Sequence, residues 1–174
     1  MFSAMRLTTV CPQANNVDTA SSTIVNYNVT TLGTITDINV ELEVGDHYID
    51  DLKITLVHNA ISVVVYNGSA DSYNAVMDAT FDDDAANPPP VAGSVIGDFK
   101  PFGPGTLADF NGGNAFGLWQ LFIIDETIFP GDGNDLTKFN LIITTDTPVS
   151  EPATLALFGL GIAGLGVARR RKAA

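Results

Sequence analysis

The sequence has little cysteine, histidine or basic charge, and each shortage removes a class of function. Cys11 is the single cysteine among 174 residues, so neither an intramolecular disulfide nor a cysteine-based zinc site can form. The two histidines, His47 and His58, lie in no known nucleophile or metal-binding motif. The Gly-x-Ser-x-Gly elbow and the His-Glu-x-x-His motif are both absent. We therefore expect that the protein is not an enzyme.

Basic residues are few and unevenly placed. Four of the eight are Arg169, Arg170, Arg171 and Lys172, so residues 1–152 carry 20 acidic against 4 basic residues, a net charge of −16. Such a body repels nucleic acid and anionic lipid and attracts cations. Only 16% of all residues are charged and the mean hydropathy is +0.20, which argues against wholesale disorder. The length suits one domain with appendages.

Short runs with a period of two predict an all-β protein. In residues 38–44 (INVELEV) apolar and polar residues alternate, as in a strand that buries one face. Further strands are predicted at 23–29, 52–56, 61–65, 118–124 and 139–143. Turns rich in glycine, proline and asparagine separate these runs, and no helical period precedes residue 152. The pattern predicts a β-sandwich or a barrel.

Composition divides the chain into four parts. Residues 1–19 do not read as a secretory signal, so either the start is truncated or misassigned, or export uses another signal. Residues 20–145 form the β-domain, in which residues 82–98 are predicted to be a long acidic, proline-rich loop. Residues 146–152 form a linker, and residues 153–174 form a predicted short hydrophobic helix with a basic tail.

The second half of the β-domain carries a set of spaced motifs. They are formed by Gly97, Phe99, Pro101, Leu107, Phe110, Gly112, Gly117, Trp119, Leu121, Asp125, Asp132 and Leu136. With Tyr48–Leu52 and Phe81–Asp83, they resemble the P-domain (P/Homo B domain) that follows the catalytic domain of subtilisin-like proprotein convertases. This resemblance spans residues 20–145 and implies a jelly-roll antiparallel β-sandwich. In that family the catalytic triad belongs to the preceding subtilase domain, which agrees with a non-catalytic chain.

The C-terminal stretch joins a proline motif, an apolar segment and a basic cluster. Residues 153–168 are uncharged and would span about 24 Å as a helix, less than the roughly 30 Å of a bilayer's hydrocarbon core. The order of the three features resembles the PEP-CTERM sorting signal of Gram-negative bacteria. Its motif residues here are Ser150, Glu151, Pro152, Arg169, Arg170 and Arg171. The resemblance implies a transient stop in the inner membrane and cleavage by an exosortase near Glu151–Pro152; a plain C-terminal anchor is the alternative.

Aspartates near the ends of predicted strands supply a candidate calcium site. Ca2+ prefers six to eight oxygen ligands, which clustered carboxylates and backbone carbonyls provide. The predicted ligands are Asp51, Asp82, Asp83, Asp125 and Asp132, with Asp84 and Asp135 as secondary candidates. The alternative is that these aspartates only form turns and add charge.

Three functions remain open at this point. The first is a non-catalytic exported protein on the cell surface or in the extracellular matrix, with a surface polymer as one possible partner. The second is an accessory P-domain fragment of a secreted subtilisin-like protease, and the third is a carbohydrate-binding jelly roll. We favour the first, because the tail and the body together form an exported unit. Trp119 alternates with Leu121 and Ile123, so we assign it to the core and not to a ligand platform.

Overall fold

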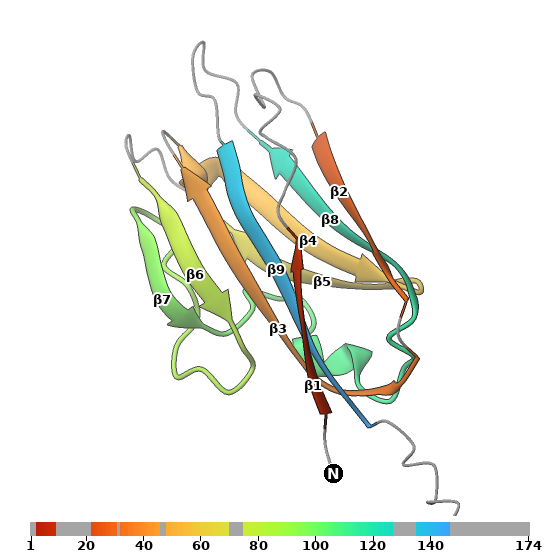
Figure 1. Cartoon of the computed structure of the whole chain (residues 1–174). Coiled ribbons are helices and arrows are strands. Elements are labelled where there is room, and N and C mark those ends of the chain that lie inside the picture. Colours follow the sequence, from red (N-terminus) through yellow and green to blue (C-terminus); the bar gives the residue numbers. More distant parts are fainter. Residues whose placement is uncertain are drawn as a thin grey trace, which may run out of the picture.

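The computed structural model describes residues 3–9, 22–30, 32–45, 48–69, 75–126 and 135–146. Nine strands in these residues form two sheets that pack face to face (Figure 1). Sheet A has five strands in the order β1-β9-β3-β6-β7, and sheet B has four in the order β2-β8-β4-β5. The predicted all-β sandwich is confirmed. The predicted C-terminal helix lies outside the described residues.

The chain passes repeatedly between the two sheets, and only β4–β5 and β6–β7 are consecutive strands of the same sheet. Sheet A consists of β1 (Ser3–Thr9), β3 (Thr34–Gly45), β6 (Met77–Phe81), β7 (Val95–Phe99) and β9 (Asp135–Asp146). Sheet B consists of β2 (Ser22–Val29), β4 (Leu52–His58), β5 (Ile61–Asn67) and β8 (Gly117–Asp125). Two 3-10 helices, η1 (Ile49–Asp51) and η2 (Leu107–Phe110), lie in the connections before β4 and β8.

The strand pairing is that of a jelly roll. Antiparallel pairs are nested along the chain, β1 with β9, β2 with β8, β3 with β6, and β4 with β5. A long double hairpin with such nested pairs forms a jelly roll when successive pairs fall in alternate sheets. The pairs β3–β9 and β4–β8 then join the halves of each sheet.

Strand β7 lies outside this scheme and corrects two expectations. It pairs in parallel with β6 at the edge of sheet A, so this sheet is mixed and not purely antiparallel. A parallel pair needs a long crossover, which residues 82–94 provide. The prediction of a loop over residues 82–98 was therefore wrong at its end, where β7 begins at Val95.

The N-terminal segment also differs from its expected place. Strand β1 pairs with β9 along its whole length, from Ser3 opposite Thr145 to Thr9 opposite Phe139. The sandwich therefore includes part of residues 1–19, which the sequence pattern had set apart from the β-domain. At its other boundary, β9 ends at Asp146, where the predicted linker begins.

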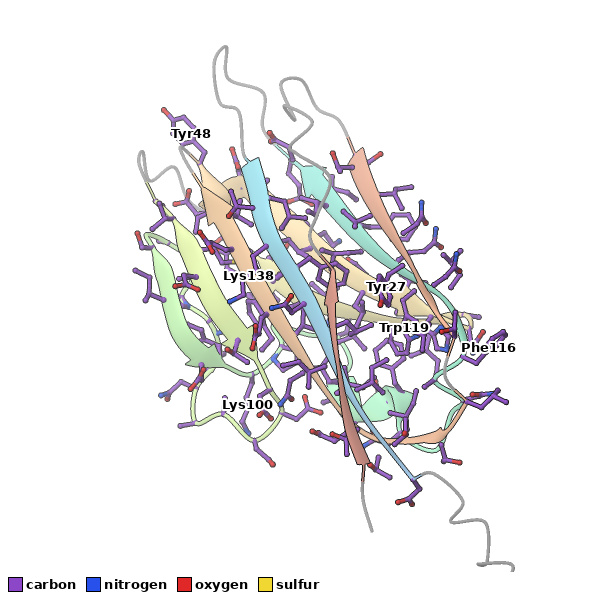
Figure 2. All side chains as sticks on the ribbon, in the orientation of Figure 1. Tyr27, Tyr48, Lys100, Phe116, Trp119 and Lys138 are labelled. Atoms are coloured by element: carbon purple, nitrogen blue, oxygen red, sulfur yellow. The ribbon has the colours of Figure 1, made fainter. Side chains whose placement is uncertain are left out.

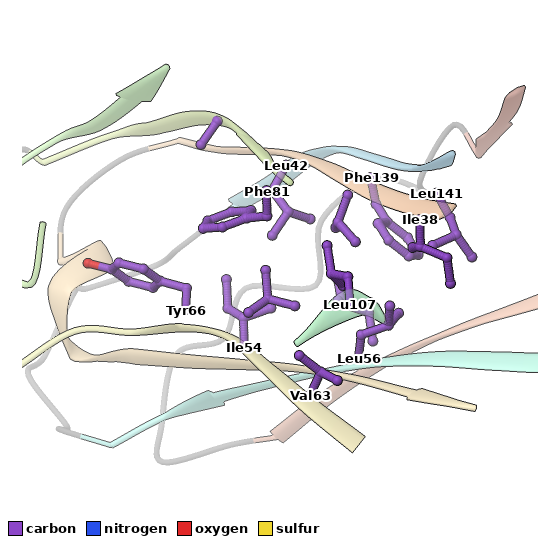
Figure 3. Packing of buried hydrophobic residues seen from close by; sticks show 14 of the residues in the cluster. Ile38, Leu42, Ile54, Leu56, Val63, Tyr66, Phe81, Leu107, Phe139 and Leu141 are labelled. Atoms are coloured by element: carbon purple, nitrogen blue, oxygen red, sulfur yellow. The ribbon is translucent and has the colours of Figure 1, made fainter. Parts of the chain in front are cut away.

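A single hydrophobic core fills the space between the sheets (Figure 3). Alternation supplies it from both sides, with Ile38 and Leu42 pointing inward from β3 and Ile54 and Leu56 from β4. Burial of such side chains contributes about 1.5–3 kcal/mol each. Leu107 of η2 is buried with them, so the long connection after β7 is part of the core.

The connection between β7 and β8 also covers one sheet edge. Strand β5 is the outer strand of sheet B, and its backbone would otherwise present unpaired polar groups. The N–H groups of Phe102 and Gly103 donate to the carbonyl oxygens of Val65 and Val64, both at 2.9 Å. This protected edge makes β5 a poor template for pairing with another chain.

Candidate functional sites

Trp119 and His58 form a stacked pair inside the sandwich. Their rings lie 3.9 Å apart and are nearly parallel, at 2°, and both side chains are buried. The Trp119 indole N–H donates to the carbonyl oxygen of Ala115 at 2.9 Å. The two ring nitrogens of His58 lie 2.8 and 2.9 Å from the carbonyl oxygens of Leu118 and Asn114. The assignment of Trp119 to the core is confirmed, and His58 holds β4 against the start of β8; His47 lies outside the described residues.

Three carboxylates are buried at the end of the sandwich that carries η1, called here the η1 end. Asp50 and Asp51 belong to η1, and Asp125 is the last residue of β8. Their exposed fractions are 0%, 6% and 3%. Asp125 lies opposite Leu52 in the register of β4 and β8, and the N–H of Glu126 donates to the carbonyl oxygen of Asp51 at 3.1 Å. The fold therefore brings the predicted ligands Asp51 and Asp125 to one place, together with Asp50, which was not among the predicted ligands.

Tyr66 lies beside these carboxylates. Its side chain is buried at one end of the core, with the hydroxyl pointing away from the other labelled residues (Figure 3). That hydroxyl has no hydrogen-bond partner among the described residues. Burial raises the pKa of Tyr66, and the negative charges of Asp50 and Asp51 raise it further. The η1 end is thus an acidic, water-poor environment that disfavours additional negative charge.

We predict that Tyr66→Phe increases the free energy of unfolding at pH 7 by about 1 kcal/mol, because it removes a buried hydroxyl without a partner. Because the pKa of Tyr66 is raised on folding, the tyrosine ionises first in the unfolded state, so the wild-type protein loses stability as the pH rises above about 10, the range of a free tyrosine. Urea unfolding of the wild-type and Tyr66→Phe proteins from pH 8 to about pH 11.5, which spans the titration of a free tyrosine, tests this. Equal losses above pH 10 in the two proteins contradict the assignment.

A second acidic group lies at the opposite end of the sandwich, called the η2 end. The carboxylate of Asp83 accepts hydrogen bonds from the N–H groups of Leu107 (3.1 Å) and Ala108 (2.7 Å), at the start of η2. Asp82 accepts a hydrogen bond from the N–H of Asp84 at 2.8 Å, which forms a tight turn. Both carboxylates therefore have local structural roles.

The charges at the η2 end repel one another. The pKa of Asp37 on β3 is raised, first by partial burial and then by the negative charges of Asp82, Asp84 and Asp83, against a backbone hydrogen bond that lowers it. The three carboxylates of Asp82, Asp83 and Asp84 therefore disfavour the ionised form of Asp37.

The two acidic groups cannot share one metal ion. Phe81 lies opposite Val40 on β3, whereas η1 follows the end of β3 at Gly45, so the groups are separated by roughly 20 Å of strand. Figure 2 shows Tyr48, which precedes η1, and Phe116, which precedes β8, at opposite ends of the sandwich. Among the described residues, no group of three histidine, cysteine, aspartate or glutamate side chains could hold a metal ion. The predicted five-residue ligand set is therefore divided between the two ends, and Asp132 lies outside the described residues.

Asp135, a secondary candidate, begins β9 at the η1 end, where its backbone lies opposite Gly45. The connection that carries Asp132 starts after Glu126 and ends at Asp135, so both of its ends belong to the η1 end. Of the predicted calcium ligands, the described residues thus bring Asp51 and Asp125 together at the η1 end.

The outer faces of the two sheets differ in charge. On β3, β6, β7 and β9, the outward side chains of sheet A include five acidic residues and one basic residue, Asp37, Glu41, Glu43, Asp78, Asp98 and Lys138. Glu41 accepts a hydrogen bond from Asn140 at 2.6 Å and lies 3.4 Å from the Lys138 ammonium. On the strands of sheet B, Lys53 is the only charged residue that points outward. Sequence reasoning identified the overall negative charge but not its restriction to one face and the two ends.

The predicted sorting residues, Ser150, Glu151, Pro152 and Arg169–Arg171, lie outside the described residues, so comparison with known families tests them. Residues 148–172 match the family described as the PEP-CTERM protein-sorting motif. The tail is a sorting signal. It indicates an exported protein that crosses the membrane, is sorted to the cell surface and has an exosortase as its processing partner. No P-domain family matches the body.

No curated protein matches the sequence. Two similar solved structures are the serine protease of Aeromonas sobria in complex with its chaperone (13% identity, TM-score 0.49) and the same protease alone (14% identity, TM-score 0.48). They cover 85% and 84% of this chain, which spans only 27% and 26% of the protease chains. Within the described residues, no helix is long and apolar enough to cross a membrane.

Proposed function

We propose that this protein is a non-catalytic exported β-sandwich, which an exosortase processes and which then remains on the cell surface or in the extracellular matrix. The observation that carries the proposal is the sorting motif at residues 148–172, joined directly to an acidic sandwich that ends at Asp146. An acidic, hydrated body is suited to water outside the cell, where it repels anionic lipid. His58, the histidine of the described residues, is held by backbone carbonyls and a stacked indole, which suits a structural role.

Three features of the tail have separate roles. The apolar residues 153–168 would hold the chain in the inner membrane, and Arg169–Arg171 would remain on the cytoplasmic side under the positive-inside rule. This places Glu151 and Pro152 on the outer side, within reach of a membrane-embedded processing enzyme. Because the apolar segment is shorter than the hydrocarbon core is thick, it is suited to temporary retention and release.

Replacing Arg169, Arg170 and Arg171 together with glutamine is expected to abolish surface display in a host that contains the cognate exosortase, because the chain loses its orientation signal. Fractionation of cells into cytosol, membranes and surface material measures the change. Lys100→Gln, in an exposed part of the body, is the matched control and should leave the distribution unchanged. A wild-type protein that stays in the cytosol contradicts the proposal.

Two other functions are kept as alternatives to be tested. An accessory role for a secreted subtilisin-like protease rests on the P-domain resemblance and predicts a protease whose thermal stability rises when this chain is added. A carbohydrate-binding role predicts retention on a polysaccharide or a glycan array. Phe116 is half exposed and is the aromatic side chain that could best stack on a sugar ring, whereas Trp119 is buried.

Calcium is a further proposal, located at the η1 end. If Asp51 and Asp125 act with oxygens of residues 127–134, millimolar Ca2+ should raise the melting temperature, because ligands that bind only the folded state stabilise it. At 100 times the dissociation constant the gain is about 2.7 kcal/mol. Calorimetry with Ca2+ or a chelator measures this, and Asp51→Asn should remove the response while Asp98→Asn, on the outer face of sheet A, should not. Identical scans with Ca2+ and chelator contradict a calcium site.

A further inference from the structure

The ring of His58 has a backbone carbonyl oxygen at each of its two nitrogens. His58 lies opposite Trp119 in the register of β4 and β8, is buried and stacks on the indole at 3.9 Å. Its Nδ1 lies 2.8 Å from the carbonyl oxygen of Leu118, and its Nε2 lies 2.9 Å from that of Asn114. Carbonyl oxygens only accept hydrogen bonds, so each ring nitrogen needs a hydrogen to bond its carbonyl. Both contacts are hydrogen bonds only when the ring is an imidazolium, which carries both hydrogens.

Asn59 offers the neutral ring a different partner. Its Nδ2 lies 2.8 Å from Nε2 of His58, close enough to donate to that nitrogen once the nitrogen has lost its hydrogen. Asn59 and Ala60 form the two-residue turn between β4 and β5 with φ of 47° and 67°, as in a type I′ hairpin, and this turn holds the amide beside the ring. Among the described residues, Nδ1 has only the carbonyl oxygen of Leu118 as a partner. Nε2 is therefore the nitrogen that can give up its hydrogen.

Two arrangements of hydrogen bonds follow from these contacts. In the protonated ring, Nδ1–H donates to Leu118 and Nε2–H donates to Asn114, and the Asn59 amide rotates so that its oxygen faces the ring. In the neutral ring, Nδ1–H still donates to Leu118, but Nε2 accepts from Asn59, and the Asn114 carbonyl faces a lone pair. Each form makes two bonds, but those of the imidazolium are charge-assisted and about twice as strong as neutral ones. Protonation thus adds a bond between β4 and the segment before β8.

No ion-pair partner of His58 lies within the part of the chain that the structure describes. The charged or titratable residues on the elements around it are Lys53, Tyr66, Asp125, Tyr27, Asp109 and Lys100. The first three lie towards the η1 end, roughly 13–20 Å away along the strands. Tyr27 lies across β8, opposite Trp119, and Asp109 and Lys100 are exposed. The charge of an imidazolium here is stabilised by the two carbonyls and by the indole face, which attracts cations.

The segment that His58 bonds also joins the two sheets at the η2 end. Thr34, at the start of β3, forms a bridge with Asn114 and lies opposite Asp146, the last residue of β9. The N–H of Ala115 donates to the carbonyl oxygen of Gly33 at 3.0 Å. The bond from Nε2 therefore ties β4 to the corner at which β9 ends, shortly before the sorting motif at residues 148–172.

We propose that His58 is a pH-sensitive latch, in which protonation of Nε2 ties the Asn114 carbonyl to β4 and loss of that proton frees it. Because the folded state bonds the protonated ring more strongly than the neutral ring, the contribution to stability is present at low pH. It is lost as the pH rises through the range in which histidine titrates. The sandwich is then firmer in mildly acidic surroundings. The latch belongs to the folded body, so it works whether or not the chain is exported or its tail removed.

NMR of the His47→Gln protein tests the latch directly, because His58 is then the only histidine. The ring nitrogens are labelled with 15N and followed from about pH 5 to about pH 9, which spans the titration of histidine. We expect a hydrogen on both nitrogens at the acidic end and on Nδ1 alone at the alkaline end. A ring that does not change over this range would overturn the proposal, as would a neutral ring that keeps its hydrogen on Nε2.

Urea unfolding measures the effect on stability. The matched control for the His47→Gln protein is the double variant His47→Gln/His58→Gln, which has no histidine. At each pH, the unfolding constant of the double variant is divided by that of His47→Gln. This ratio should be about fivefold larger at about pH 5.5 than at about pH 8, since charged hydrogen bonds contribute more than neutral ones. A ratio that is the same at both pH values contradicts the latch. The NMR measurement needs only the His47→Gln chain, so it decides the question even if the double variant does not fold.

Discussion

Trp119→Ala is expected to lower the free energy of unfolding by about 3–5 kcal/mol, the range for truncation of a fully buried tryptophan. The variant loses the indole contacts with the core and the hydrogen bond to Ala115. It also loses the ring on which His58 stacks and the tilted contact with Phe110 at 5.1 Å. Because domains are stable by about 5–15 kcal/mol in total, the loss is a large share of the stability.

Urea unfolding measured by circular dichroism gives the loss. The matched control is Leu118→Ala, the preceding residue of the same strand, which points outward and is 45% exposed. It should cost less than about 1 kcal/mol, since little of its surface leaves water on folding. Similar losses for the two variants would contradict the inward direction of Trp119 and, with it, the register of β8.

Gly68→Ala is expected to cost about 3 kcal/mol or more. A Cβ at this position would overlap the main-chain Cα, C and O atoms of Asp50, which cannot rotate away as a side chain can. The N–H of Gly68 donates to the carbonyl oxygen of Leu52 at 3.1 Å. This hydrogen bond holds the end of β5 against the chain at Asp50 and Leu52. The substitution therefore separates the end of β5 from η1.

Thermal and urea unfolding measure this effect, with Gly112→Ala as the control. Gly112 has φ of +81° but no atom within 4 Å of a Cβ, so only the backbone cost of about 1–2 kcal/mol applies. A Gly68→Ala protein as stable as the control would show that η1 does not pack against β5 as described.

The sequence predicts most of the strands whose two faces differ, although β6, which also alternates, was not predicted. In β3 and β4 most inward positions are apolar and most outward ones polar, so a period of two is visible in the sequence. Strand β7 buries only Val95 and exposes Ile96, Gly97 and Asp98, so its sequence shows no alternation. Its parallel pairing depends on the long connection from β6 and on no local signal.

The candidate site is predicted less well, for a geometric reason. Aspartates at strand ends are visible in the sequence, but the end of the sandwich at which each strand stops depends on the strand order. Asp51 and Asp125 meet because β4 and β8 are neighbours with opposite directions, whereas Asp82 follows β6 at the other end. The exposure of Leu118 and Ile124 on sheet B escapes prediction because they occupy outward positions in a run, LWQLFII, that is apolar at most positions.

The sorting signal was predictable because it depends on the order of residues in one short segment and not on tertiary structure. Residues 148–172 combine the motif, the apolar segment and the basic cluster within a single stretch. A function that resides in a linear segment can be recognised whether or not the fold of the body is known.

The central claim is that an exosortase removes the tail from a folded, exported sandwich. The intact mass of the protein, recovered from cells with and without the exosortase, tests this most directly. With the enzyme, we expect surface material whose mass corresponds to a chain that ends at or next to Glu151; without it, the full chain should remain in the inner membrane. Full-length protein in both strains, in the same cellular fraction, would contradict the account.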